Sequence, residues 1–247
     1  MPEIASPPEL PSHLLHGVGP GDFWAVGQHT VGLVRQLAHL GGASERVLDI
    51  GCGMGRVAWP LAQALDERST YDGFDTLAPY VEACRERLAL NPERYRFHHF
   101  DLHSSLYNPN GAIRSEDFHF PWNDGAFTLA IATSLFTHLT PAAATHYLRE
   151  IARTLARGGR LYATFFVLDD HARELMRERP TDPDFRAPFP EGMYADAENP
   201  EAAVAFDAQW LLKTFLEAGY KIEHYAPGYW RRTAGAEYQD VVVASKT

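Results

Sequence analysis

The sequence predicts an α/β fold with a doubly wound, mostly parallel sheet, and three observations support this prediction. From Arg46 onward, short apolar runs typical of buried strands alternate with stretches of helical spacing. The first apolar run ends in a glycine-rich turn, Gly51-Cys52-Gly53-Met54-Gly55, and a helical pattern follows directly. Two further segments, 221–226 and 238–244, are predicted as strands that close the chain. A Rossmann-like sheet has this succession of elements.

The chain begins with an arm and a helix. Repeated prolines make 1–20 an irregular arm, and apolar residues three to five positions apart predict a helix over 22–40. Gly41-Gly42 ends that helix. The run 47–50 is the first strand, and helical spacing makes 56–66 the first crossover helix.

The middle of the chain continues the alternation. The second strand is expected at 71–75, and the next helix opens at Pro79, because proline is well tolerated in a first turn. A third strand is expected at 94–100. The run 126–133 is almost continuously apolar, which indicates a fourth strand buried on both faces.

The alternation stops after a fifth strand, expected at 160–167. Before it, a helix starts at Thr140-Pro141 and is closed by Gly158-Gly159. After it, many prolines and aromatics make 169–205 an insertion that is partly irregular. Helical spacing resumes over 206–219. We therefore expect an N-terminal arm and helix over 1–45 and one domain over 46–247 that contains this insertion.

The composition limits the function. The 247 residues carry a formal net charge of −10, which argues against a nucleic-acid partner. No apolar run is long enough to span a membrane, and the N-terminus lacks the pattern of a signal peptide. Two cysteines suggest neither a disulfide framework nor a metal site, so a cytoplasmic location is expected. The oligomeric state is not indicated.

The glycine-rich turn points to a specific class of ligand. Glycine has no Cβ, so bare backbone can approach a bound molecule, and the following helix directs free N–H groups at the same place. Asp49 lies beneath the turn, where it could meet a cationic amine. A dinucleotide fingerprint reads Gly-x-Gly-x-x-Gly, but the third glycine here, Gly55, comes one residue early. A nucleoside with a positively charged amino-acid tail suits these residues better than a pyrophosphate.

The run 47–56 closely resembles motif I of the class I S-adenosylmethionine-dependent methyltransferases. The resemblance extends over most of 46–246 and implies seven strands in the order 3-2-1-4-5-7-6, a closing antiparallel hairpin and S-adenosylmethionine as cofactor. The insertion at 169–205 would then be a lid after strand five. A dehydrogenase fits less well, because no Tyr-x-x-x-Lys pair with the required spacing is present.

The resemblance also implies the residues that bind the cofactor. Asp75 ends the second strand, where a carboxylate can accept two hydrogen bonds from ribose hydroxyls; its alternative role is a charge at a helix N-terminus. Asp101 would accept from the adenine amino group, although an exposed strand-end acid is also possible. The complete expected cofactor set is Asp49, Gly51, Cys52, Gly53, Gly55, Asp75, Thr76, Asp101, Leu102, Thr133 and Ser134.

Three segments are similar to those of a group of small-molecule methyltransferases. They are 133–139 (Thr-Ser-Leu-Phe-Thr-His-Leu), 108–111 (Asn-Pro-Asn-Gly) and 238–243 (Tyr-Gln-Asp-Val-Val-Val). The Asn-Pro-Pro-Tyr signature of amino-directed DNA and protein methyltransferases is missing after strand four. The paired metal ligands of catechol-type enzymes are not evident either, so no metal is expected.

These observations predict methyl transfer to a small organic acceptor, most simply to a hydroxyl. His138 is the candidate general base, with a helix-capping role as its alternative. N- or C-methylation, or a module that binds the cofactor without catalysis, remains the alternative function. The aromatic residues expected to line the acceptor site are Phe23, Trp24, Trp122, Phe136 and Tyr194.

Overall fold

The computed structural model describes residues 6–17, 21–41 and 44–247. The chain folds as two compact units, residues 1–101 and residues 102–247. Among the described residues, no helix is long and apolar enough to cross a membrane.

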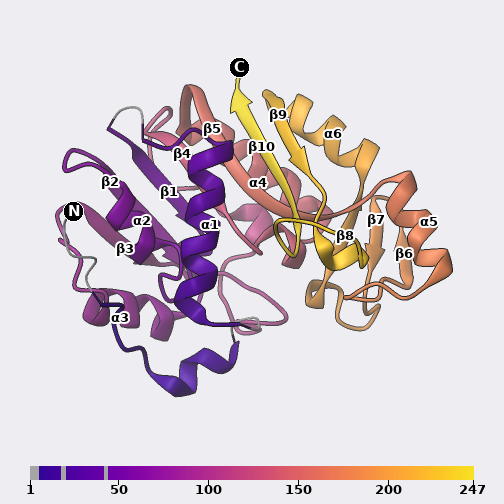
Figure 1. The fold of residues 1–247 in the computed structure, drawn as a ribbon, viewed down its shortest axis with the longest axis horizontal. Helices are drawn as coiled ribbons and strands as arrows, with labels where there is room; N and C mark the ends of the chain where they lie inside the picture. Colours follow the sequence, from indigo (N-terminus) through magenta and orange to yellow (C-terminus); the bar gives the residue numbers. More distant parts are fainter. Residues whose placement is uncertain (1–5, 18–20, 42–43) are drawn as a thin grey trace. The chain divides into compact units, whose positions relative to one another are not determined.

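The first unit contains three parallel strands with helices between them (Figure 1). Strand β2 pairs with β1 on one side and with β3 on the other, which gives the order β3-β2-β1. Val47, Leu48 and Ile50 of β1 are fully buried, as the apolar run predicts. The elements are η1 (Ser12–Gly17), α1 (Phe23–Leu37), β1 (Arg46–Ile50), α2 (Ala58–Ala64), β2 (Thr70–Asp75), α3 (Ala78–Arg87) and β3 (Tyr95–His99).

The second unit is organised around the long strand β5. β4 pairs parallel with β5, whereas β10 runs antiparallel to both β5 and β9, and Figure 1 shows β5, β10 and β9 side by side. The elements are η2 (Ser115–Asp117), β4 (Phe127–Ala132), η3 (Phe136–His138), α4 (Pro141–Thr154), β5 (Leu155–Leu168), α5 (Asp170–Glu178), β6 (Ala187–Phe189), β7 (Gly192–Tyr194), η4 (Pro200–Ala202), β8 (Val204–Asp207), α6 (Ala208–Glu217), β9 (Tyr220–Ala226), η5 (Tyr229–Arg231) and β10 (Asp240–Lys246).

The predicted strand order is confirmed within each unit, with more strands than expected. The expected runs 3-2-1 and 4-5-7-6 correspond to β3-β2-β1 and to β4-β5-β10-β9. The insertion at 169–205 adds the extra strands, because β6, β7 and β8 form an antiparallel set and β8 pairs parallel with the end of β5. The described part of the chain thus has ten strands and not seven.

Two predicted boundaries are wrong for identifiable reasons. Gly158-Gly159 does not close α4, which passes into β5 at Leu155, a residue with extended backbone. The two glycines lie inside β5, where its register against β4 shifts and Gly158 adopts φ +73°. Phe206 opens no helix: it is a fully buried residue of β8, and α6 starts only after Asp207, whose side chain caps it.

A buried charged pair fixes the start of β10. Arg231 is 1% exposed, and its guanidinium lies 2.9 Å from the carboxylate of Asp240, which is fully buried. Asp240 also accepts hydrogen bonds from Val167 N, Gly228 N and Trp230 Nε1 at 2.7–2.8 Å. These contacts hold this part of the 238–243 motif against the end of β5.

Candidate functional site

The glycine-rich turn is fixed to the end of β2 by backbone hydrogen bonds. Gly51 N and Cys52 N both donate to the carbonyl of Phe74 at 2.9 Å. Gly53 N donates to Asp75 Oδ2 at 2.8 Å. All three glycines of the turn have positive φ angles, +72°, +54° and +77° in order. These conformations favour glycine, which explains the alternate-residue spacing.

The second and third glycines of the turn have different surroundings. A Cβ built on Gly53 meets no described heavy atom within 4 Å, so this side of the turn faces open space. A Cβ built on Gly55 comes within 2.4 Å of Leu88 Cδ1 and 3.3 Å of Cys84 Sγ. Gly53 therefore leaves room for a ligand against the backbone, whereas Gly55 is required for packing.

Asp49 is a buried acid next to the turn. It is 1% exposed, and Oδ2 accepts a hydrogen bond of 2.7 Å from the hydroxyl of Tyr71. Burial raises the pKa of Asp49 to about 7; the bond from Tyr71 opposes this rise, and the nearby charge of Asp75 adds to it. A cation bound close to Asp49 would reverse the effect and favour the carboxylate.

Asp75 connects the turn to the beginning of α3. Oδ2 accepts from Gly53 N, and Oδ1 accepts from Leu77 N at 2.9 Å. Burial raises the pKa of Asp75, and the hydrogen bonds from backbone N–H groups limit the rise. Each oxygen keeps a second lone pair, so the helix-start role does not exclude hydrogen bonds from ribose hydroxyls. Thr76 follows directly, and its carbonyl lies 3.2 Å from His99 Nε2.

The other expected cofactor residues have different environments. Cys52 is 5% exposed within the turn, and its thiol forms no disulfide bond. Asp101 is exposed at the end of the first unit. Leu102 is buried in the second unit, where it forms a bridge with Ile113 and its carbonyl accepts from Asn108 Nδ2 at 3.0 Å.

In the first unit, the N-terminal arm and the start of α1 line a cavity of about 430 Å³. Phe23 and Trp24 are both in its wall, and their rings meet edge to face with centroids 4.8 Å apart. Trp24 Nε1 donates to Pro8 O at 3.1 Å, which attaches the arm to the helix. Phe23 belongs to a core cluster with Met54 of the glycine-rich turn. The cavity is lined by Pro8, Glu9, Leu10, Leu15, Gly21, Asp22, Phe23 and Trp24.

In the second unit, His138 is held in one orientation. It lies in η3, shortly after β4, and its Nδ1 is 2.8 Å from the carbonyl oxygen of Glu201. A backbone carbonyl only accepts hydrogen bonds, so Nδ1 must carry the hydrogen. Nε2 of the neutral ring then carries the electron pair, which accepts a hydrogen bond of 3.4 Å from the hydroxyl of Tyr107. Burial lowers the pKa of His138, and the bond to Glu201 opposes the shift.

Sequence reasoning missed the two residues that surround His138. Tyr107 meets its ring edge to face at 5.4 Å. The carboxylate of Glu201 accepts from Ser104 Oγ at 3.0 Å and from Ser105 N at 2.6 Å, which fixes the loop that carries Tyr107. Glu201 belongs to the insertion, 63 positions from His138, and no local pattern marks it. Only the similarity of the nearby 108–111 segment drew attention to this loop.

The structure does not support a lining role for two of the expected aromatic residues. Phe136 is fully buried and stacks on Phe165 with centroids 4.6 Å apart, so it belongs to the core. Trp122 packs on Phe127 at the amino end of β4, whereas ligands of such sheets bind at the carboxyl ends of strands. Tyr194 is half-buried on β7 and stacks on Phe189.

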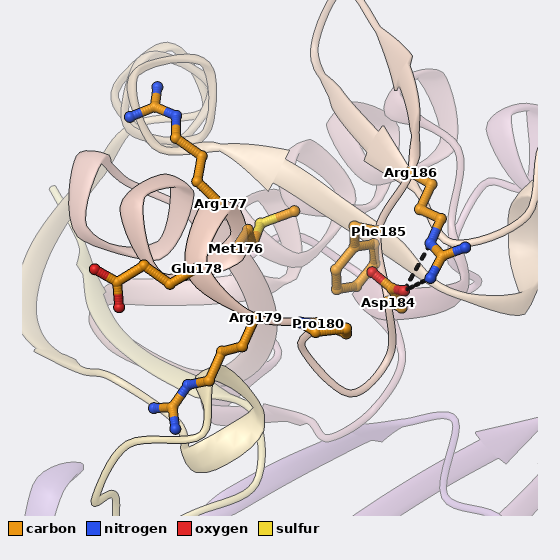
Figure 2. A pocket seen from close by; sticks show the side chains of 8 residues that line it. All are labelled: Met176, Arg177, Glu178, Arg179, Pro180, Asp184, Phe185 and Arg186. Carbon is orange, nitrogen blue, oxygen red and sulfur yellow. Dashed lines mark hydrogen bonds and ion pairs between the residues drawn. The ribbon is translucent and has the colours of Figure 1, made fainter.

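A second cavity, of about 330 Å³, lies within the insertion (Figure 2). Residues at the end of α5 form one side, and Asp184, Phe185 and Arg186 form the other. Figure 2 shows that Arg177 and Arg179 point away from one another and that Arg186 is bonded to Asp184. The described residues contain no group of histidine, cysteine and acidic side chains arranged to hold a metal ion.

Comparison with known proteins finds a family match over the first strands and helices of the sheet. Residues 47–159 match the family model of a methyltransferase domain. This match and the shared fold of the solved structures below support a class I S-adenosylmethionine-dependent methyltransferase. The matched region includes the glycine-rich turn, the ends of β2 and β4, and His138. The cofactor is therefore S-adenosylmethionine, and the open side of Gly53 fits the close approach of that ligand to the backbone.

Solved structures share the fold at low sequence identity. Magnesium protoporphyrin IX methyltransferase from Synechocystis, with bound S-adenosylhomocysteine, has a TM-score of 0.58 and 18% identity, with 94% of this chain and 91% of that chain covered. The 1,6-didemethyltoxoflavin N1-methyltransferase of Burkholderia thailandensis has a TM-score of 0.55 and 21% identity, with 92% and 81% covered. The [4+2]-cyclase SpnF has a TM-score of 0.59 and 18% identity, with 93% and 84% covered.

The different surroundings of Gly53 and Gly55 lead to a first prediction. Gly53→Ala should leave the melting temperature within a few degrees of wild type but weaken S-adenosylhomocysteine binding by at least about tenfold, because the new methyl group enters the ligand's space. Gly55→Ala should instead lower the melting temperature strongly, by overpacking against Leu88. Calorimetric titration and thermal unfolding measure the two effects. Equal effects of both substitutions on stability would contradict this distinction.

The buried acid leads to a second prediction. Because the pKa of Asp49 is about 7 without ligand and a nearby ammonium favours the carboxylate, S-adenosylhomocysteine should bind more tightly as the pH rises. From pH 6 to pH 8 the affinity should increase up to about tenfold, following the deprotonated fraction of the acid. Titration calorimetry across this range measures the change. Asp49→Asn should bind with little dependence on pH, and a wild-type affinity that falls with rising pH would refute the assignment.

Proposed function

We propose that this enzyme transfers the methyl group of S-adenosylmethionine to a hydroxyl of a small organic acceptor, with His138 as the general base. The observation that carries the proposal is the hydrogen bond from His138 Nδ1 to the carbonyl of Glu201. It fixes the tautomer whose Nε2 can accept a proton. Burial keeps the pKa of His138 below its ordinary value of 6.5, so the ring is neutral and ready to act as a base at pH 7.

Most of the residues proposed to hold the cofactor belong to the first unit. We assign the amino-acid end to the glycine-rich turn and to Asp49, whose carboxylate would pair with the ammonium group. Asp75 would accept from the ribose hydroxyls, and Asp101 from the adenine amino group. The second lone pair on each Asp75 oxygen and the exposure of Asp101 support these roles. Further contacts are assigned to Gly51, Cys52, Gly53, Gly55, Thr76, Leu102, Thr133 and Ser134.

The chemistry requires little more than position and a proton acceptor. The bound cofactor supplies an electrophilic methyl group on a sulfonium sulfur. The chain must align the acceptor oxygen with that methyl group, and such alignment supplies a large part of the rate. His138 would take the hydroxyl proton on Nε2 as the oxygen attacks. The hydroxyl of Tyr107, which donates to Nε2 at 3.4 Å in this structure, would be displaced by the hydroxyl of the acceptor.

The acceptor is proposed to be a small, partly apolar molecule. Phe23 and Trp24 line an existing cavity, and Tyr194 is accessible on β7. The net charge of −10 disfavours nucleic acid, and we place the reaction in the cytoplasm, on a domain over 46–247 preceded by the arm and helix of 1–45. Two proteins of similar fold act, according to their names, on 1,6-didemethyltoxoflavin and on magnesium protoporphyrin IX.

N-methylation is the second candidate, because one protein of similar fold is an N1-methyltransferase. A neutral amine or ring nitrogen attacks with its own lone pair and needs no general base before transfer. The two candidates therefore differ in how strongly turnover depends on His138.

This difference gives a third prediction. His138→Asn should lower methyl transfer from tritium-labelled S-adenosylmethionine about 10²–10⁴-fold while leaving cofactor affinity nearly unchanged. Wild-type turnover should rise with pH through an ionisation below 6.5, because only the neutral ring can accept the proton, and the variant should lack that step. The measurement is turnover against pH with the acceptor that wild-type enzyme methylates.

A second histidine provides the control. His146 lies on α4, and its Nε2 is 2.8 Å from the carbonyl oxygen of Phe118. Like His138 it bonds a backbone carbonyl, but unlike His138 it does not lie in the segment directly after β4. His146→Asn should keep the turnover and its pH dependence. If His138→Asn is less stable but fully active, His138 caps a helix and does not serve as a base, which would favour N-methylation.

A further inference from the structure

Ser134 has an unusual backbone conformation for a residue that is not glycine. It follows the end of β4, its side chain is exposed, and its φ angle is +54°. Side chains with a Cβ rarely occupy this left-handed region, because the Cβ approaches the following carbonyl oxygen. Such a conformation persists only where the surrounding structure imposes it, and it is frequent at functional sites.

Two buried side chains impose this conformation. Ser134 N donates to Thr164 Oγ1 at 2.7 Å, and Thr164 Oγ1 in turn donates to Gln239 Oε1 at 2.6 Å. Ser134 Oγ donates to the same Gln239 oxygen at 3.2 Å. Thr164 is 3% exposed and Gln239 is 7% exposed, so water does not compete for the hydrogen bond between them, and their side of the bonds to Ser134 is shielded.

Gln239 is itself a fixed point. It directly precedes β10, and the next residue, Asp240, is held by Arg231 and by three N–H groups. The amide nitrogen of Gln239 also reaches Thr137, one residue before His138, at 3.5 Å. One side chain of the 238–243 motif thus contacts the 133–139 motif at two places, which joins two segments that the sequence shows only separately.

The direction of these hydrogen bonds determines what Ser134 can offer to a ligand. The amide oxygen of Gln239 can only accept, so the hydrogen of the Ser134 hydroxyl points inward. The outward side of Ser134 Oγ therefore carries lone pairs. A ligand group at this position must be a hydrogen-bond donor, such as a hydroxyl or an ammonium.

We propose that Gln239 is a positioning residue that holds Ser134 in its left-handed conformation and turns its hydroxyl into an acceptor for a donor group of a bound ligand. This inference rests on the proposed function, which assigns Ser134 to the ligand site. The donor is either the ammonium of the cofactor or a hydroxyl or amine of the methyl acceptor. Each of these groups would donate a hydrogen bond to Ser134 Oγ.

The test compares crystal structures of wild type, Gln239→Leu and Gln239→Leu/Ser134→Gly. In Gln239→Leu the φ angle of Ser134 should become negative, because the conformation loses its support. In the double variant, position 134 should return to positive φ, because glycine adopts that region without help. If Gln239 only stabilised the fold, replacing Ser134 by glycine would not restore the positive φ angle at position 134. Thr164→Val, which removes the acceptor of Ser134 N at nearly constant volume, serves if Gln239→Leu does not fold.

The inference is overturned if Ser134 keeps its positive φ in Gln239→Leu or, where that variant does not fold, in Thr164→Val. Gln209→Leu, at an exposed glutamine on α6, is the control and should change nothing at position 134. None of these readouts uses turnover, so a failure of His138 as the base would be seen separately.

Calorimetric titration with S-adenosylhomocysteine then distinguishes the two sources of the donor. Ser134→Gly keeps the backbone conformation but removes the hydroxyl. An affinity about tenfold lower would assign the donor to the cofactor's ammonium, since hydrogen bonds to charged groups are the strong ones. An unchanged affinity would assign it to the methyl acceptor, whose KM should then rise in the same variant.

Discussion

The attachment of the glycine-rich turn to the end of β2 is the constraint on which the proposed cofactor site depends. The Phe74 carbonyl accepts two N–H groups of the turn, and the Asp75 carboxylate accepts a third. These bonds require the positive φ angles that glycine provides. They also keep Asp75 beside the turn and leave Asp49 beneath it, away from water. One small set of backbone contacts thereby places two acids and an open stretch of backbone together.

The second unit holds the segment 133–138 in a different way. No strand continues through 133–138; instead, side chains and carbonyls that are distant in sequence hold it. Glu201 fixes the tautomer of His138, while Thr164 and Gln239 fix the backbone of Ser134. Buried groups of this kind are strongly oriented, because an unsatisfied partner would be costly. Under the proposed function, these contacts would hold rigid the segment that must align the acceptor.

The fold was largely predictable from the sequence, because alternating apolar runs and helical spacing are local signals. The turn after β1 and the acid that ends β2 were also predictable, since both belong to one short βαβ unit. Glu201 and Gln239 were not, because their contacts join positions 63 and 105 residues apart. The aromatic composition did not indicate which rings line the acceptor site either. Phe136 packs in the core, and Trp122 packs at the amino end of β4, away from the carboxyl ends of the strands. The strands β6–β8 were missed because they are only three or four residues long, too short for a strand pattern to stand out.

Titration calorimetry of the wild-type protein with S-adenosylhomocysteine and, separately, with NAD⁺ tests the central claim most directly. The claim is that the turn held by Phe74 and Asp75 binds a nucleoside with an amino-acid tail. The account predicts saturable binding of S-adenosylhomocysteine with one site per chain and no measurable heat with NAD⁺. Binding of NAD⁺ without binding of S-adenosylhomocysteine would contradict it.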